Sequence, residues 1–134
     1  MSDELRIRVP YVPPVNMNIN AHTHWRRKHP EEQNAHEMAF MAARSHLAQS
    51  PFTVPDHPVL VAVIHWPKGR KRRDPDNALS SAKWLTDGVC KALGVDDRVF
   101  MTSMAFQRRA PKGCDGFTDI IIRPATVEER RLAA

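Results

Sequence analysis

The sequence predicts a small mixed α/β protein whose elements run in the order β-α-β-α-β-β, with two main helices packed on the sheet. Three observations lead to this prediction. Several short segments have the alternation or the β-branched composition of strands, two longer segments repeat apolar residues at helical spacing, and prolines or glycines separate them. A chain of 134 residues with 42% hydrophobic content fits one domain, residues 1–134.

The first half of the chain predicts one strand and one helix. Residues 5–9 alternate apolar and charged side chains, as a half-buried strand does, and Pro10 ends the run. The polar residues 15–29 predict a loop. Pro30 suits the first position of a helix over residues 30–49, whose apolar stripe consists of Ala35, Met38, Ala39, Ala42 and Ala43.

The second half predicts three strands and a second helix. Residues 59–66 form a short β-branched run typical of a buried strand, and a helix then begins near Asp76 or Asn77 and ends at Gly94. Two further strands are expected. They cover residues 99–109 and 116–123, with a hairpin turn at Pro111-Lys112-Gly113, and the charged tail 125–134 is expected to be a short frayed helix.

The charge of the chain points to a polyanionic partner. Lysine and arginine outnumber aspartate and glutamate by 20 to 15, which gives a formal charge of +5 and favours nucleic acid. No segment reads as a signal peptide, a membrane span or a basic amphipathic helix, so we expect no membrane contact. The two cysteines lack zinc-site spacing and predict reduced thiols in the cytoplasm. The densest positive charge is a cluster formed by Lys68, Arg70, Lys71, Arg72 and Arg73.

A second basic cluster precedes the first predicted helix. Cations with an aromatic side chain among them suit phosphate contacts and base stacking. The alternative is a solvated loop whose Trp25 packs on the core. His22 and His24 could suggest a zinc site, but the sequence offers no matching Cys or His partners for it. The candidate DNA contacts here are His24, Trp25, Arg26, Arg27 and Lys28.

Acidic residues follow the basic cluster at once. Asp74 and Asp76 share a side of an extended segment, and Asp97 or its neighbour Asp96 could close the same site after the second helix. Carboxylates are the ligands that magnesium prefers, and magnesium activates water for phosphodiester hydrolysis. Capping of the helix is the alternative role for such aspartates.

Helical spacing gives this second helix two faces. Asp76, Lys83 and Asp87 fall in one narrow sector. A lysine there could stabilise negative charge on a phosphate, although Lys83 and Asp87 could also form a plain i,i+4 ion pair. The apolar residues fall on roughly the opposite side and are expected to face the sheet: Leu79, Ala82, Leu85, Val89, Ala92 and Leu93.

Together these motifs resemble the RusA family of Holliday-junction resolvases, especially its phage and prophage members. The resemblance implies a RusA-like fold and a homodimeric, magnesium-dependent endonuclease, with manganese as a substitute, that cuts four-way DNA junctions by paired nicks in bacterial or phage-infected cells. The motifs that carry it are Val12-Pro13-Pro14, Asn20, His24-Trp25-Arg26, Arg72–Asn77, Lys83, Asp87-Gly88 and Asp96-Asp97.

The resemblance also implies roles for individual residues. Asp74, Asp76 and Asp97 would be the metal-binding catalytic aspartates, Asp96 a supporting acid and metal ligand, and Lys83 the catalytic lysine. In the best-known members this lysine follows the second aspartate by four residues, a position that Ser80 occupies here. Two other functions stay open: a nucleic-acid-binding module without catalysis, and a metal-dependent nuclease for flaps or RNA.

Overall fold

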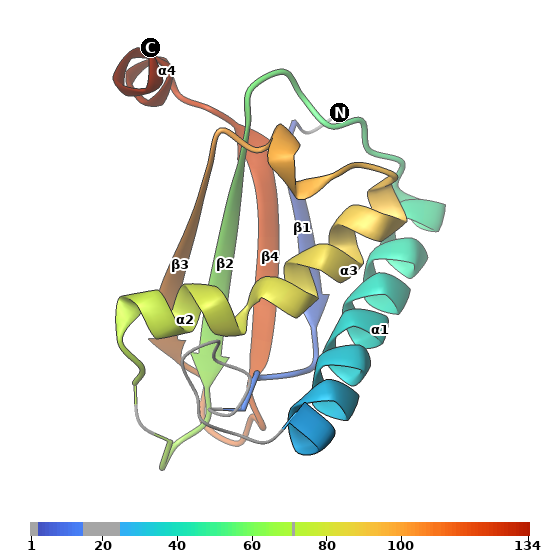
Figure 1. The fold of residues 1–134 in the computed structure, drawn as a ribbon, viewed down its shortest axis with the longest axis vertical. Helices are drawn as coiled ribbons and strands as arrows, with labels where there is room; N and C mark the ends of the chain where they lie inside the picture. The colour runs from blue at the N-terminus through green and yellow to red at the C-terminus, as the bar shows by residue number, and fades with distance from the viewer. Residues whose placement is uncertain (1–2, 15–24, 71) are drawn as a thin grey trace.

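The computed structural model describes residues 3–14, 25–70 and 72–134, without the side chains of residues 25–29. It is a mixed α/β fold built on one four-stranded sheet (Figure 1). The elements are β1 (Leu5–Val9), α1 (Trp25–Gln49), β2 (Pro58–Trp66), α2 (Pro75–Ser81), α3 (Lys83–Leu93), a 3-10 turn (Asp97–Val99), β3 (Thr102–Arg109), β4 (Phe117–Pro124) and α4 (Val127–Ala133).

The sheet has the strand order β1-β4-β2-β3. β4 pairs antiparallel with both β1 and β2, whereas β2 and β3 are parallel. The predicted hairpin at residues 111–113 is therefore wrong, because β2 lies between β3 and β4. The apolar β2 is almost wholly buried and occupies an interior position, so residues 110–116 cross its end. The backbone N–H of Ala110 donates to the carbonyl of Trp66 at 2.7 Å during this crossing.

The two faces of the sheet differ in what covers them. One face carries the main core, in which Ile7, Ile120 and Ile122 pack with Ala39 of α1 and Leu85 of α3. A smaller cluster on the other face consists of Val59, Val61 and Ile121 and includes no residue of α1, α2 or α3. These three helices accordingly lie together on one side of the sheet (Figure 1).

The first helix begins at Trp25, five residues before the predicted start, and contains Pro30. Pro30 is the sixth residue of this helix, where it removes one backbone hydrogen bond and crowds the carbonyl four residues earlier, yet the helix continues through it. α1 packs closely along α3 at Gly88. A Cβ atom at this position would collide with the carbonyl oxygen of His36 and lie 3.0 Å from the backbone nitrogen of Phe40.

The second predicted helix is broken at Ala82, whose φ of −84° and ψ of −5° separate α2 from α3. The helix direction changes at this point (Figure 1). Ala82, Leu85 and Val89 face the core as predicted, but Leu79 is 41% exposed because it lies on the far side of the break. Gly94 ends α3 with φ 73°, which confirms the predicted glycine stop.

The charged tail forms the short helix α4. Thr126 and Glu129 make a reciprocal capping box at its start. Arg123 of β4 joins it to the sheet by donating to both carboxylate oxygens of Glu129, at 2.8 and 3.1 Å. Within the described parts of the chain, no helix combines the length and apolar character needed to cross a bilayer.

Candidate functional site

Three of the predicted site residues border one hollow, which we call the acidic hollow. Asp76 comes from α2, Lys83 from the start of α3, and Asp97 from the 3-10 turn that precedes β3. The hollow has a volume of about 470 Å³ and lies against β2 and β3 on the helix-covered face. Its full lining is Leu60, Ala62, Asp76, Leu79, Ser80, Lys83, Thr86, Asp97, Ser103 and Met104.

Asp74 and Asp76 lie at the start of α2, where Pro75 sets the first helical position. Asp74 occupies the N-cap by its backbone, and its carbonyl accepts the N–H of Ala78 at 2.9 Å. Its side chain, however, makes no capping hydrogen bond. The carboxylate of Asp74 is exposed and outside the lining of the acidic hollow, whereas Asp76 contributes to that lining.

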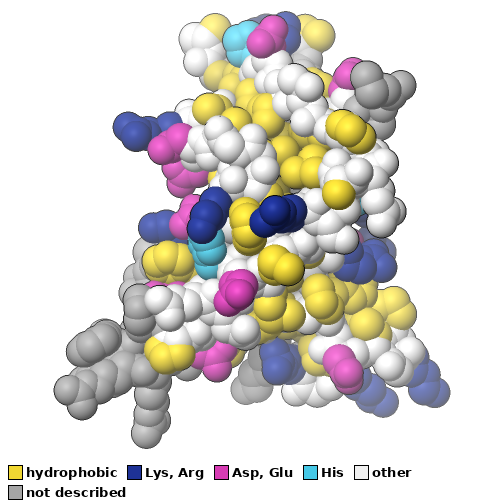
Figure 2. All heavy atoms as spheres, turned by 90° about the vertical axis from the view of Figure 1, so that its right-hand side faces the viewer, with side chains coloured by type: hydrophobic (Ala, Val, Ile, Leu, Met, Phe, Trp, Pro, Cys, Tyr) yellow, Lys and Arg dark blue, Asp and Glu magenta, His cyan; other side chains and the backbone are white. Residues whose placement is uncertain are grey.

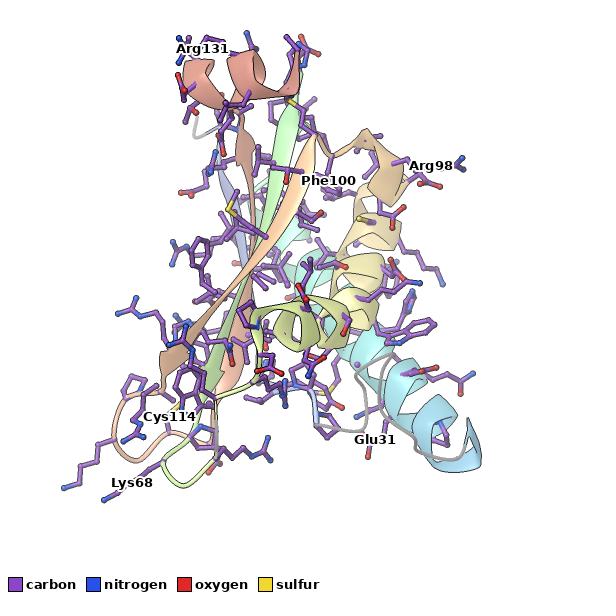
Figure 3. The ribbon with its side chains drawn as sticks, turned by 60° about the vertical axis from the view of Figure 1, so that its left-hand side comes forward. Glu31, Lys68, Arg98, Phe100, Cys114 and Arg131 are labelled. Atoms are coloured by element: carbon purple, nitrogen blue, oxygen red, sulfur yellow. The ribbon has the colours of Figure 1, made fainter. Side chains whose placement is uncertain are left out.

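The acidic pair after α3 divides into two roles. Asp96 accepts the backbone N–H of Arg98 at 2.9 Å and its guanidinium Nε at 3.2 Å. These two contacts lower the pKa of the Asp96 carboxyl to about 2. Arg98 points away from the sheet (Figure 3), and Asp97 is the member of the pair that borders the acidic hollow.

Lys83 and Asp87 lie one turn apart on α3. Burial raises the pKa of Asp87, Lys83 opposes this rise, and the negative charges of Asp97 and Asp96 add to it. Asp87 is therefore a half-buried carboxylate within the electrostatic reach of the acidic hollow. Its alignment with Asp76 and Lys83 is the sequence signal for it, and the metal ligands predicted from the sequence do not include it.

Arg73 has a different environment from the rest of the basic cluster. Its guanidinium donates to Ser81 Oγ at 3.1 Å and to the carbonyl of Pro13, while its backbone N–H donates to Gln107 Oε1 at 2.8 Å. Burial lowers the pKa of this half-buried side chain. Arg73 thus anchors the segment that leads into Asp74 and Asp76.

The other described cations of the basic cluster are exposed: Lys68, Arg70 and Arg72. Their loop lies at the same end of the molecule as the β3–β4 connection, as the positions of Lys68 and Cys114 show (Figure 3). Several predicted DNA contacts lie outside the described residues. These are Lys71 and His24, together with the side chains of Trp25, Arg26, Arg27 and Lys28.

The acidic hollow offers a limited set of metal ligands. Within the described residues, no group of three or more His, Cys, Asp or Glu side chains is arranged to hold a metal ion. Magnesium is often held by only one or two carboxylates, with water and substrate phosphate as its remaining ligands. Asp76 and Asp97, which border one open hollow, are the two carboxylates that could supply such ligands.

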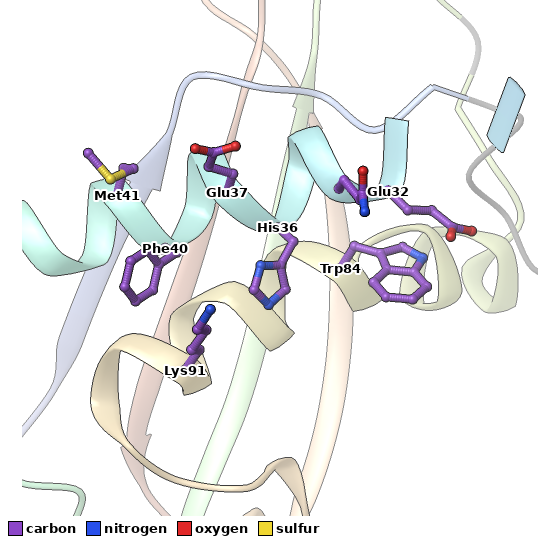
Figure 4. Close-up of a pocket in the computed structure, with 8 residues that line it drawn as sticks. Glu32, His36, Glu37, Phe40, Met41, Trp84 and Lys91 are labelled. Atoms are coloured by element: carbon purple, nitrogen blue, oxygen red, sulfur yellow. The ribbon is translucent and has the colours of Figure 1, made fainter. Parts of the chain in front are cut away.

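A second hollow of about 670 Å³ lies between α1 and α3 (Figure 4). Acidic, basic and aromatic side chains alternate around it, and the ammonium of Lys91 lies 5.2 Å from the ring centroid of Phe40. The α1 side of the molecule intermixes the same types of side chain (Figure 2). The labelled lining residues are Glu32, His36, Glu37, Phe40, Met41, Trp84 and Lys91.

Comparison with known proteins gives no activity. No family model matches the chain. A similar protein from Xylella fastidiosa (strain Temecula1 / ATCC 700964), described as an uncharacterized protein, is 32% identical over 91 residues, or 67% of this chain. The match covers 59% of that relative, less than two thirds of its length.

Proposed function

We propose that the protein is a magnesium-dependent, structure-selective endonuclease that resolves four-way DNA junctions, as RusA-type resolvases do. The observation that carries this proposal is the acidic hollow, where Asp76, Lys83 and Asp97 border one space although they come from three separate elements. Carboxylates and a lysine around one hollow suit a substrate that brings both a metal ion and a phosphate.

Each residue has a defined task in this proposal. Asp76 and Asp97 would hold Mg²⁺, or Mn²⁺ in its place, and the exposed Asp74 at the N-cap of α2 would support them from the substrate side. The metal, when bound, supplies an activated water and neutralises charge on the phosphoryl oxygens. Lys83 would hold the scissile phosphate, and the exposed Lys68, Arg70 and Arg72 would contact the DNA backbone.

A homodimer suits the proposed substrate. A four-way junction has approximate two-fold symmetry and needs cuts in two related strands. Two copies of the chain related by a two-fold axis would present two equal sites to it.

The proposal is tested by comparing substrates under magnesium titration. A four-way DNA junction, a flap, a linear duplex and an RNA hairpin are each incubated with the protein at increasing Mg²⁺. We expect paired nicks in the junction that require the metal. Preferential cutting of the flap or the RNA would instead assign the same chemistry to another substrate. Metal-independent binding that leaves every substrate intact would identify a binding module without catalysis.

Two variants separate chemistry from binding. Asp74→Asn and Asp76→Asn each remove a charge that would attract the metal while keeping the side-chain shape. We expect both to lose junction cleavage and to keep junction binding. Cleavage at the wild-type rate by both variants would refute the proposal.

A further inference from the structure

The sheet face opposite α1, α2 and α3, which we call the open face, has an ordered pattern of side chains. Cross-strand neighbours share a face, so the strand register places Arg8, Asp119, Val63 and Phe106 in one row across it. The flanking rows contain Arg6, Ile121, Val61 and Met104 on one side, and Phe117, His65 and Arg108 on the other.

The β3 side of the open face presents an accessible aromatic ring. Phe106 is 53% exposed, a large value for a phenylalanine that sits beside the half-buried Val63. Within the described chain, the small apolar cluster around Val59, Val61 and Ile121 on this face includes no helical residue, and α4 is tied to the face only at its end, through the Arg123–Glu129 ion pair. A flat strand surface with a protruding ring is the geometry on which nucleobases stack.

The charged side chains that the open face exposes to solvent are arginines, while its aspartate is buried. Arg6 and Arg8 have 57% and 62% exposed side chains, whereas Asp119, which is 3.0 Å from Arg8 and 4.0 Å from Arg6, is 2% exposed. Arg8 is held in place because it donates to Asp119 at 3.0 and 3.3 Å and lies 4.1 Å from the ring centroid of Phe117. Arg108 adds a third exposed guanidinium.

We propose that the open face binds an unpaired strand of nucleic acid, with a base stacked on Phe106 and phosphates at Arg108 and Arg8. Charge complementarity favours this occupant. Two copies of the chain docked through this face would bring arginines against arginines, whereas a phosphate backbone matches them. Stacking on a protein ring requires a base that is free of its duplex, so the face selects unpaired strands.

The open face is continuous with the basic loop. Because β2 and β3 are parallel, Arg108 pairs with His65 one residue before the end of β2, where the chain leads into Lys68 and Arg70. A strand lying on Phe106 can therefore continue along the exposed cations at this end. This site goes beyond the proposed nuclease function and does not depend on it, since it requires no metal and no cleavage.

The test measures fluorescence anisotropy of a labelled oligothymidylate of about 15 nucleotides and of a duplex of equal length, in EDTA. We expect wild type to prefer the single strand. Phe106→Ala and Phe106→Leu should each weaken single-strand binding by about 5- to 150-fold, the range for the loss of one stacked base. Phe106→Tyr should bind as wild type does. Met41→Ala, which removes a 57% exposed apolar side chain from α1, is the matched control and should change nothing.

Wild-type affinity in both Phe106→Ala and Phe106→Leu would overturn the proposal. So would equal loss of affinity for the single strand and the duplex. Sedimentation velocity tests the alternative that a second copy of the chain occupies this face. If Phe106→Ala converts a dimer to monomers and leaves the single-strand affinity unchanged, the open face is an interface between copies and the proposal is wrong. Circular dichroism of each variant checks the fold, and the exposure of Phe106 predicts wild-type spectra.

Discussion

Arg73 and Gln107 are joined by hydrogen bonds in both directions. The backbone N–H of Arg73 donates to Gln107 Oε1 at 2.8 Å, and Gln107 Nε2 donates to the carbonyl of Arg73 at 2.6 Å. One side chain of β3 thus satisfies both backbone groups of the residue that precedes Asp74. This contact positions the start of α2, and with it Asp76, against the edge strand.

Gln107→Ala should therefore lower the free energy of unfolding by about 1–3 kcal/mol, because it leaves both backbone groups of Arg73 without their partner. Urea unfolding followed by circular dichroism measures the change. Gln49→Ala, at the exposed end of α1, is the control and should stay within about 0.5 kcal/mol of wild type. Equal stability of the two variants would show that the contact does not hold this segment.

Arg72 and Arg73 should respond differently to neutralisation. Arg72 is exposed, so Arg72→Gln should keep the stability of the fold and make the salt dependence of DNA binding shallower by about 0.9 in the log–log slope. Arg73→Gln leaves Ser81 and Pro13 without the guanidinium donor and should instead lower stability by about 1–3 kcal/mol. Binding titrations at several salt concentrations and urea unfolding separate these effects. Identical behaviour of the two variants would contradict the anchoring role of Arg73.

Gly88→Ala should destabilise the packing of α1 on α3. The added methyl group would meet the carbonyl of His36, a backbone atom that can move only if the helices separate, at a cost of about 1–3 kcal/mol. Gly94→Ala is the comparison, since its Cβ meets nothing within 4 Å and only the φ of 73° is strained. Thermal unfolding should show a greater drop in Tm for Gly88→Ala than for Gly94→Ala. A greater drop in Tm for Gly94→Ala would mean that α1 and α3 move apart at little cost to accept the added methyl group.

Asp87→Asn should stabilise the protein at neutral pH. Burial raises the pKa of Asp87 above 3.8 in the folded state, so the unfolded chain gives up this proton more readily. The free energy of unfolding therefore falls as the pH rises through the interval between the unfolded and folded pKa values. Asp87→Asn cannot ionise and so avoids that loss of stability. Its gain in unfolding free energy over wild type should vanish at about pH 3, where Asp87 is protonated in both the folded and the unfolded wild-type protein. A gain of equal size at both pH values would exclude ionisation of Asp87 as the cause.

Local signals in the sequence predicted much of the fold. The alternation over residues 5–9 and the glycine stop at Gly94 depend on a few neighbouring residues, and both match the structure. The break at Ala82 has no such signal, because alanine is the best helix former. The false hairpin has a similar cause. Neighbouring strands in sequence usually pair, but the buried β2 takes the place between β3 and β4.

The candidate site was predictable in its composition and less so in its geometry. Helical counting aligned Asp76, Lys83 and Asp87, but it could not place Asp97 at the same hollow, since that depends on how the chain returns into β3. The division between Asp96 and Asp97 depends on Arg98, whose backbone and guanidinium both bind Asp96. An aspartate two residues before an arginine is a local pattern that could have indicated this pairing.

Junction cleavage by Asp97→Asn, compared with Asp96→Asn, tests the central claim most directly. Both variants remove one charge from adjacent residues, but Asp97 borders the acidic hollow and Asp96 is held by Arg98. The rate of Mg²⁺-dependent nicking of a four-way DNA junction is measured for wild type and both variants under single-turnover conditions. We predict that Asp97→Asn, which removes a proposed metal ligand, loses cleavage by at least about 100-fold, the upper end of the loss caused by mutating a mere outer-shell partner, while Asp96→Asn stays within about tenfold of wild type. Wild-type cleavage by Asp97→Asn would contradict the assignment of the acidic hollow as the catalytic site.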